Sequence, residues 1–367
     1  MNNQKHKALV PFLAIIAGIL VGFILLIITN KNPLILFEEL IKGLIGFDLS
    51  RGKIIQMNYI GELLVASMPI VLTGLAIAFA YRTGLFNIGA EGQVIMGSLF
   101  TIFVATQVEL PGFIHLPLAL FAGALGGALW GLIPGLLKAY FNILEVVVGI
   151  MLNYVAMYLS NYFVVNMEGF RNLRSPSVLP SASLRAPWLG QLFGNSRFHL
   201  GIVVVVIAIF AYWFIIEKTT YGYNLRATGY NKDGAEYAGL KVNRNIISSM
   251  MISGAFAGLA GSLLTLGTFG SVMALTSFGN VGYDGIAVAL VGNLSGIGIA
   301  FSGILFGLLG VTKPMLQMRG IPEEIASIIA AFIVFFVASQ KILPIVMNWF
   351  KKRKEEKLLL ASKGGEQ

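Results

Sequence analysis

Long apolar stretches alternate with short polar segments along most of the chain. Stretches of about 20 apolar residues suit α-helices that cross a hydrocarbon core of roughly 30 Å, whereas the strands of membrane barrels are short and alternate. The pattern therefore predicts an all-α integral membrane protein with about ten spanning helices. We place them over residues 9–29, 60–80, 86–106, 115–139, 144–165, 199–216, 246–268, 281–294, 297–312 and 322–347.

The first stretch invites comparison with a secretory signal peptide, because Lys5 and Lys7 precede it. Its apolar run is longer than that of a signal peptide, and no small-x-small cleavage site follows. We expect the segment to be retained as the first span.

Composition agrees with a membrane location. Hydrophobic residues make up 56% of the 367 residues, charged residues only 12%, and the mean hydropathy is +0.80. The 43 glycines suit helices that pack closely in lipid. Cysteine is absent, which excludes disulfides, thiol chemistry and thiolate metal sites.

The basic residues predict the orientation of the chain. With the N-terminus inside the cell, 16 of the 26 Lys and Arg residues fall on the inner side, and most of the others lie in two longer outer loops. This bias places both termini and residues 221–244 in the cytoplasm. The net charge of +9 is spread over loops and a tail, so membrane orientation explains it better than nucleic-acid binding does. The tail segment 351–357, KKRKEEK, is expected to be a solvated anchor that also touches anionic lipid.

One polar segment, residues 221–244, carries the signals of a folded element. Asn231 is a suitable N-cap, Asp233 favours the positive end of a helix, and Gly239 suits the left-handed residue that ends one. These signals predict a short helix over residues 232–238 on the membrane face. Its small residues would let another protein come close, with Tyr237 and Leu240 as apolar contacts; the alternative is an interfacial helix that only seats the chain at the lipid headgroups.

A short motif occurs twice. Its six positions follow the pattern N-[I/V]-G-x-[E/D]-G, where x is any residue. It opens the third predicted span at residues 87–92 and the eighth at residues 280–285. Because the two spans are five apart, the copies enter the membrane from opposite faces. This spacing predicts two five-helix halves of inverted topology, a plan used by many transporters.

The acids of the two motif copies, Glu91 and Asp284, are candidates for the solute pathway. A carboxylate within an apolar span is costly unless it faces a cavity or a partner. Each acid also suits a purely structural position at a helix start, where the helix dipole favours negative charge. The residues alone favour the structural interpretation for either acid.

Amide side chains at or within the spans are the other pathway candidates. They bind solute hydroxyls or base edges in some proteins, but more often they join neighbouring helices. Asn153 and Asn293 stand out because each lies inside an apolar stretch. The amides considered are Asn87, Gln93, Asn153, Asn161 and Asn293.

Several chemistries lack the residues they need. No phosphate-binding loop of the P-loop type occurs, so the chain is not expected to hydrolyse ATP. The three histidines stand far apart, and no serine-hydrolase motif is present. The sequence predicts no catalytic residue, no metal site and no cofactor.

Two segments carry a resemblance to a known family. GLFNIGAEGQVIMG, at residues 84–97, and GYNLRATGYNKDGAEYAGLKV, at residues 222–242, resemble the permease subunits of bacterial ABC importers for nucleosides and simple sugars. The resemblance extends from about residue 60 to 344, and it is nearest to the longer of the two permeases in nucleoside uptake systems of Gram-positive bacteria. It implies the ten-helix fold of type II ABC importers.

The resemblance also implies partners. In this family the segment after the sixth span forms a coupling helix that docks on a cytoplasmic ATPase, which favours docking for residues 221–244. A second, homologous permease and an external substrate-binding lipoprotein are expected as well. Gly234 departs from the alanine usual in the family and would loosen the first turn of the helix. The coupling contacts carried over are Arg226, Gly229, Asn231, Ala235, Tyr237, Ala238 and Gly239.

The expected organisation is therefore one transmembrane permease domain over residues 1–367, with an external loop at 166–198, the cytoplasmic coupling segment at 221–244 and a cytoplasmic tail at 350–367. Two alternatives to nucleoside import stay open. One is a permease of the same family for ribose or galactose. The other is an ion-coupled secondary transporter in which Glu91 and Asp284 bind the coupling ion.

Overall fold

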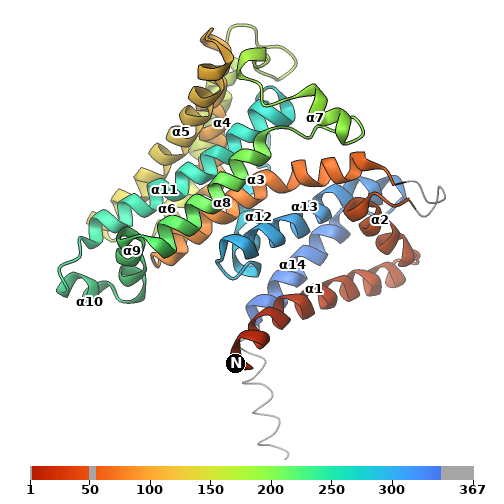
Figure 1. The fold of residues 1–367 in the computed structure, drawn as a ribbon, viewed down its shortest axis with the longest axis horizontal. Helices are drawn as coiled ribbons and strands as arrows, with labels where there is room; N and C mark the ends of the chain where they lie inside the picture. Colours follow the sequence, from red (N-terminus) through yellow and green to blue (C-terminus); the bar gives the residue numbers. More distant parts are fainter. Residues whose placement is uncertain (1, 49–54, 340–367) are drawn as a thin grey trace, which may run out of the picture. The chain divides into compact units, whose positions relative to one another are not determined.

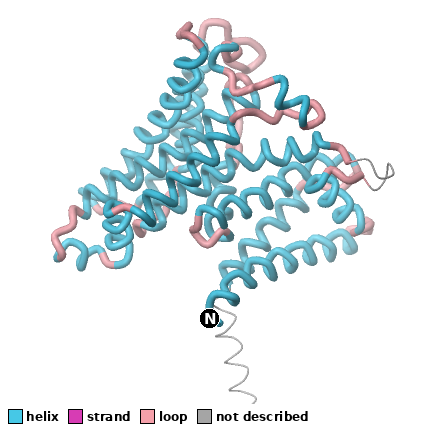
Figure 2. The backbone as a smooth tube through the Cα atoms, viewed as in Figure 1, coloured by secondary structure: helices cyan, strands magenta, loops and turns pink. Residues whose placement is uncertain are grey.

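The computed structural model describes residues 2–48 and 55–339, and most of them are helical (Figure 2). A helix coincides with each of the ten predicted stretches. Among the described residues, six helices are long and apolar enough to cross a membrane, and shorter apolar helices lie at 13–28, 281–291 and 324–337. The chain is thus a multi-pass membrane protein. The predicted tail at 350–367 and the end of the tenth span lie outside the described residues.

The chain divides into two compact units, and α1 (Asn2–Ile28) and α14 (Glu324–Ala338) form the first. They pack directly against each other. Gly18 lies at their contact, where a β carbon would come 3.2 Å from the backbone oxygen of Ile329. The small residue therefore lets the two helices approach closely.

The second unit, Ile35–Gly320, contains the other helices (Figure 1). In chain order they are α2 (Leu34–Ile45), α3 (Met57–Arg82), α4 (Ala90–Gln107), α5 (Gly112–Phe141), α6 (Glu145–Val165), α7 (Pro187–Leu192), α8 (Gly201–Lys218), α9 (Thr220–Tyr230), α10 (Lys232–Tyr237), α11 (Val242–Leu263), α12 (Val281–Val291) and α13 (Gly296–Met318), with a 3-10 turn η2 at Pro180–Ala182 and a π-helix η3 at Leu264–Phe269.

Helix α11 is the centre of this unit and packs against α3, α4 and α5. Glycines make the approach possible. A β carbon on Gly258 would collide with the carbonyl oxygen of Gly123 of α5 and lie 3.0 Å from the nitrogen of Gly127, and Gly254 is equally close to the Gly127 backbone. Helices α5 and α11 are therefore held by backbone contact, as the glycine content suggested.

The packing crosses between the two halves of the sequence. Helix α3 packs against α12 and α13, whereas α11 packs against α4 and α5. Each helix that precedes a motif copy thus contacts the helices that follow the other copy. The two motif copies consequently lie close together in the interior.

Helix α11 ends irregularly. Its last turn widens into the π-helix η3 and stops at Gly270, which has a φ of +72°. An extended segment then leads to α12, which has only 11 residues. Irregular backbone at this depth of a membrane protein is tolerated where it lies within protein or lines a cavity, and π-helices are common at functional sites.

Candidate coupling segment and solute pathway

The segment predicted to couple to an ATPase, residues 221–244, folds into two short helices. The hydroxyl of Thr219 accepts a hydrogen bond from the Gly222 N–H at 2.9 Å and begins α9, and the Asn231 side chain accepts from the Gly234 N–H at 2.9 Å and begins α10. Gly239 has a φ of +82° just beyond α10. The predicted cap and the short helix are confirmed. Helix α9 was not foreseen, although a threonine three residues before a backbone donor is a recognised start signal.

Helix α10 has one buried face and one exposed face. Ala235 is buried in a cluster that includes Leu85, Val242 and Met250. Tyr237 is 98% exposed, and Tyr230 at the end of α9 is 89% exposed. Exposed aromatic side chains of this kind are suited to contact with another protein, because such a contact would remove their large apolar surface from water.

The coupling segment is tied to the end of α3 by backbone contact. Gly229 packs so closely on the α3–α4 turn that a β carbon would come 2.6 Å from the carbonyl oxygen of Arg82 and 2.8 Å from the nitrogen of Gly84. Gly84 itself has a φ of +76°. No side chain other than hydrogen fits at position 229 without moving the turn.

Charges reinforce this junction. The carboxylate of Glu217, at the end of α8, pairs with Arg226 at 2.9 Å and also with Arg82. A cavity of about 420 Å³ opens beside the pair of arginines, with Tyr81 and Tyr230 in its wall. The ends of α3, α8 and α9 are thus held by one carboxylate.

Within the membrane region, Glu91 links the two motif copies. Its carboxylate accepts hydrogen bonds from the Asn280 N–H at 3.0 Å and the Gly282 N–H at 2.6 Å, at the beginning of α12. The side chain is buried. It satisfies two of the free N–H groups of a helix start and benefits from the helix dipole.

Three candidate amides are buried and bonded to the protein itself. Asn87 donates to Gln93 at 2.8 Å and to Ser253 at 2.7 Å. Asn153 accepts from the Gly92 N–H at 2.8 Å and donates to the hydroxyl of Tyr283 at 3.0 Å. These contacts correspond to the helix-joining use of amides.

Asn161 bonds to the backbone of Leu275, donating to its carbonyl oxygen and accepting from its N–H, both at 2.7 Å. Asp284 and Asn293 lie elsewhere. Asp284 is half-buried in α12, and its carboxylate makes no hydrogen bond to the described residues. Asn293 is exposed in the turn between α12 and α13, with a φ of +50°. Its placement inside an apolar stretch was therefore wrong, because the apolar run is interrupted by a turn at Gly292–Ser295.

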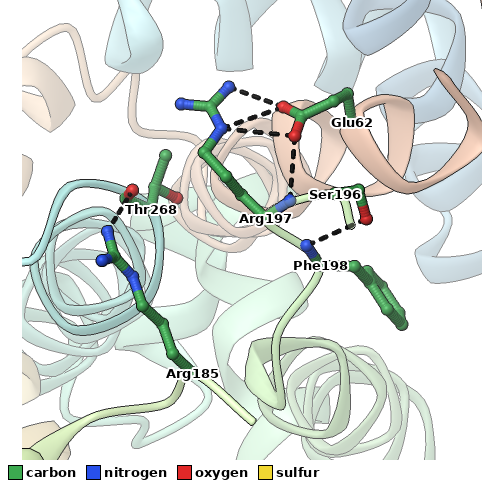
Figure 3. Close-up of polar contacts among 6 residues, drawn as sticks. All are labelled: Glu62, Arg185, Ser196, Arg197, Phe198 and Thr268. Carbon is green, nitrogen blue, oxygen red and sulfur yellow. Dashed lines mark hydrogen bonds and ion pairs between the residues drawn. The ribbon is translucent and has the colours of Figure 1, made fainter. Parts of the chain in front are cut away.

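Two cavities beside η3 were not foreseen. One measures about 490 Å³ and has Glu62, Arg197 and Thr268 in its wall. Arg197 donates to Glu62 at 2.6 Å, and Arg185 donates to the Thr268 carbonyl oxygen at 2.8 Å, so the loop before α8 is fastened to α3 and to η3 (Figure 3). The other measures about 280 Å³ and is lined by Glu91, serines and apolar residues.

His199 lies at the end of this loop, just before α8. Its Nδ1 accepts a hydrogen bond from the Gly201 N–H at 3.1 Å, and the buried Nε2 has no partner among the described residues. Burial lowers the pKa of His199 to about 4, and the positive charges of Arg185 and Arg197 act in the same direction. The imidazole is neutral at physiological pH and serves packing.

Comparisons with known proteins identify the family of the chain. The family described as branched-chain amino acid transport system, permease component, matches residues 59–338. The chain is 42% identical to the guanosine ABC transporter permease NupP of Bacillus subtilis, with 96% of this chain and 99% of the relative covered. It is 34% identical to the nucleoside ABC transporter permease NupB of Lactococcus lactis, with 95% of each covered. It is 29% identical to the glucose ABC transporter permease TsgB13 of Haloferax volcanii, with 90% and 87% covered. No solved structure matches the chain.

Proposed function

The chain belongs to the branched-chain amino acid transport system permease family, and from that premise we propose that it is the membrane-spanning subunit of an ABC importer for nucleosides. The observation that carries the proposal is the full-length similarity to two nucleoside permeases of Gram-positive bacteria. The folded segment with its exposed Tyr237 supports the ABC class, since a secondary transporter needs no such element.

The proposal includes partners. A separate cytoplasmic ATPase docks on α10 and hydrolyses ATP, a second homologous permease completes the pathway, and an external lipoprotein delivers the nucleoside. Both termini and residues 221–244 lie in the cytoplasm, and the loop at 166–198 lies outside, as the distribution of Lys and Arg favours. The membrane is the bacterial cytoplasmic membrane.

The fold proposed is two inverted five-helix halves, as in type II importers. The crossed packing of α3 with α12 and α13, and of α11 with α4 and α5, supports it. So does the contact of Glu91 with the second motif copy, because equivalent segments of inverted repeats meet near the repeat interface.

Coupling then follows from contacts that differ between two states of the ATPase. A displacement of α10 passes through the short connection at Asn231 to α9. From α9 it reaches α3 by two routes, the backbone contact at Gly229 and the Glu217 carboxylate. The remaining coupling residues act locally: Asn231 caps α10, Ala235 seats it, and Ala238 and Gly239 end it.

The test is uptake of radiolabelled purine and pyrimidine nucleosides by cells that carry the whole transport system, with Tyr237→Arg as the variant. Tyr140→Arg is the control, because Tyr140 is also exposed but lies outside the coupling segment. ATP-dependent uptake that is lost only in Tyr237→Arg, with normal amounts of protein in the membrane, supports the proposal.

Two outcomes would replace it. Uptake that persists in Tyr237→Arg and collapses with the proton gradient identifies a secondary transporter. ATP-dependent uptake of a sugar without uptake of nucleosides identifies a sugar permease. The similarity to a glucose permease is the reason to test this alternative.

A further inference from the structure

The smaller cavity beside η3 is enclosed by elements that the two motif copies bring together. It measures about 280 Å³ and lies between α4, α6, η3 and the segment that leads to α12. Small-molecule sites usually measure about 300 to 1,000 Å³. At about 280 Å³ the cavity lies just below this range, so it suits only a small solute such as a nucleoside or a monosaccharide.

Two serines in its wall have unused hydrogen-bonding capacity. Ser160 of α6 is 1% exposed and Ser271 is 7% exposed, and neither hydroxyl bonds to any of the described residues. Both hydroxyls border the cavity, so a group placed there would complete their hydrogen bonds.

The other polar groups of the wall are acceptors. Ser98 and Thr265 both donate their hydroxyl protons to the carbonyl oxygen of Gly261, at 3.1 and 2.9 Å, which leaves their lone pairs free. The carboxylate of Glu91 already accepts two backbone N–H groups and can accept more. The polar part of the wall therefore suits an uncharged ligand rich in O–H or N–H donors.

The rest of the wall is apolar. It includes Leu264 and Val272, together with the aromatic ring of Phe269. A free monosaccharide carries hydroxyls around its whole ring and would lose hydrogen bonds against such a surface. A nucleoside carries its hydroxyls at one end and a flat base at the other, which matches a wall that combines a few polar side chains with a larger number of apolar ones.

We propose that this cavity binds the nucleoside in transit, with the ribose hydroxyls at Ser160 and Ser271 and the base against Phe269 and Leu264. The proposal rests on the nucleoside importer function and adds a location and an orientation for the solute. It gives Glu91 a second task besides capping α12, as an acceptor for ribose.

The absence of cysteine from the sequence makes the cavity directly testable. Ser160→Cys and Ser271→Cys are introduced singly into the full chain, and labelling of this chain by a small thiol reagent is followed in membranes that contain the assembled transporter. Ser277→Cys is the matched control, because Ser277 is exposed in the same segment and does not border the cavity. Guanosine, uridine and ribose are the probes.

Guanosine or uridine at ten times its dissociation constant is expected to slow labelling about tenfold at positions 160 and 271, with no effect at 277 and little effect of ribose. Equal protection by ribose would overturn the orientation and the preference for nucleosides. A lack of protection, or a lack of labelling at both positions, would overturn the cavity site. Uptake by the unmodified transporter, measured in parallel, separates these results from a failure of the importer function itself.

Discussion

The carboxylate of Glu91 accepts a 2.6 Å hydrogen bond from the backbone N–H of Gly282, a residue of the second motif copy that lies 191 positions away in the sequence. The contact is so close that a β carbon on Gly282 would come 2.6 Å from the Cα atom of Glu91. The acid of the first motif copy thus needs the glycine of the second. The repeated motif is one of the places where the two halves of the sequence contact each other.

Glu91→Gln tests this junction. The amide keeps the shape, but its NH₂ group cannot accept, so one of the two N–H groups at the start of α12 loses its partner. The cost of a buried unpaired donor is about 1 to 3 kcal/mol, and the thermal unfolding midpoint of the purified transporter should fall by several degrees. Asp284→Asn is the control, since the Asp284 carboxylate makes no hydrogen bond to the described residues and its midpoint should change little.

The same pair of variants separates the ABC importer from a secondary transporter. In an ABC importer, uptake by both variants stays dependent on ATP and independent of the proton gradient. The contrary outcome has two parts: uptake by the parent protein depends on the proton gradient, and Glu91→Gln or Asp284→Asn removes this dependence. The substituted acid would then be an ion site, and the ABC assignment would fail.

Gly229→Ala is expected to uncouple the segment from α3. The new methyl group would press on the Arg82 carbonyl oxygen and the Gly84 nitrogen, both of which are backbone atoms that cannot turn aside. Overpacking of this kind costs about 1 to 3 kcal/mol, and it displaces α9 from the turn that begins the first motif. ATP-dependent uptake should fall severalfold.

Gly310→Ala is the comparison for Gly229→Ala. It lies within α13, and no atom comes within 4 Å of the position that the new methyl group would occupy, so alanine there meets open space and improves helix propensity. Uptake by this variant should be unchanged. Equal loss in both variants would show a general intolerance of added methyl groups instead of a specific junction at Gly229.

Local signals in the sequence were sufficient to locate the apolar helices and α10. A hydrophobic run, the Asn231 cap and the left-handed conformation of Gly239 are each determined by residues that are close together in the sequence. The turn at Asn293 carried a comparable signal, because an asparagine between Gly292 and Ser295 suits a left-handed turn position. The apolar residues on both sides of Asn293 led to the prediction of a continuous span instead of a turn.

The cavities could not be predicted in the same way. Ser160 and Ser271 are far apart in the sequence, and their meeting depends on the widened π-helical end of α11 and on the close approach of α4 and α11. The pairing of Glu62 with Arg197 is likewise long-range. Such contacts follow from helix packing, for which the single sequence holds only the repeated motif as a guide.

Glu217→Gln tests the charged route between α9 and α3. The amide cannot neutralise both Arg82 and Arg226, so the ends of α3, α8 and α9 should move more independently. Partly exposed ion pairs contribute only about 0 to 1 kcal/mol each, and thermal stability should therefore change little while nucleoside-stimulated ATP hydrolysis falls. Glu62→Gln breaks a similarly exposed pair far from the coupling segment and should leave this stimulation largely intact. The same fall in both variants would contradict a coupling role for Glu217.

His199 predicts a loss of stability in acid. Its pKa is about 4 in the folded protein, because burial disfavours the charged ring, and about 6.5 when the chain is unfolded. The unfolded state therefore binds more protons between these values, so the contribution of His199 is complete above pH 6.5 and is lost as the pH falls toward 4, by on the order of 3 kcal/mol. In His199→Asn the amide oxygen can still accept from the Gly201 N–H but does not titrate. Thermal unfolding midpoints of both proteins, measured from pH 7.5 to 4.5, should converge as the pH falls; a constant difference would mean that the ring is already charged or accessible in the folded state.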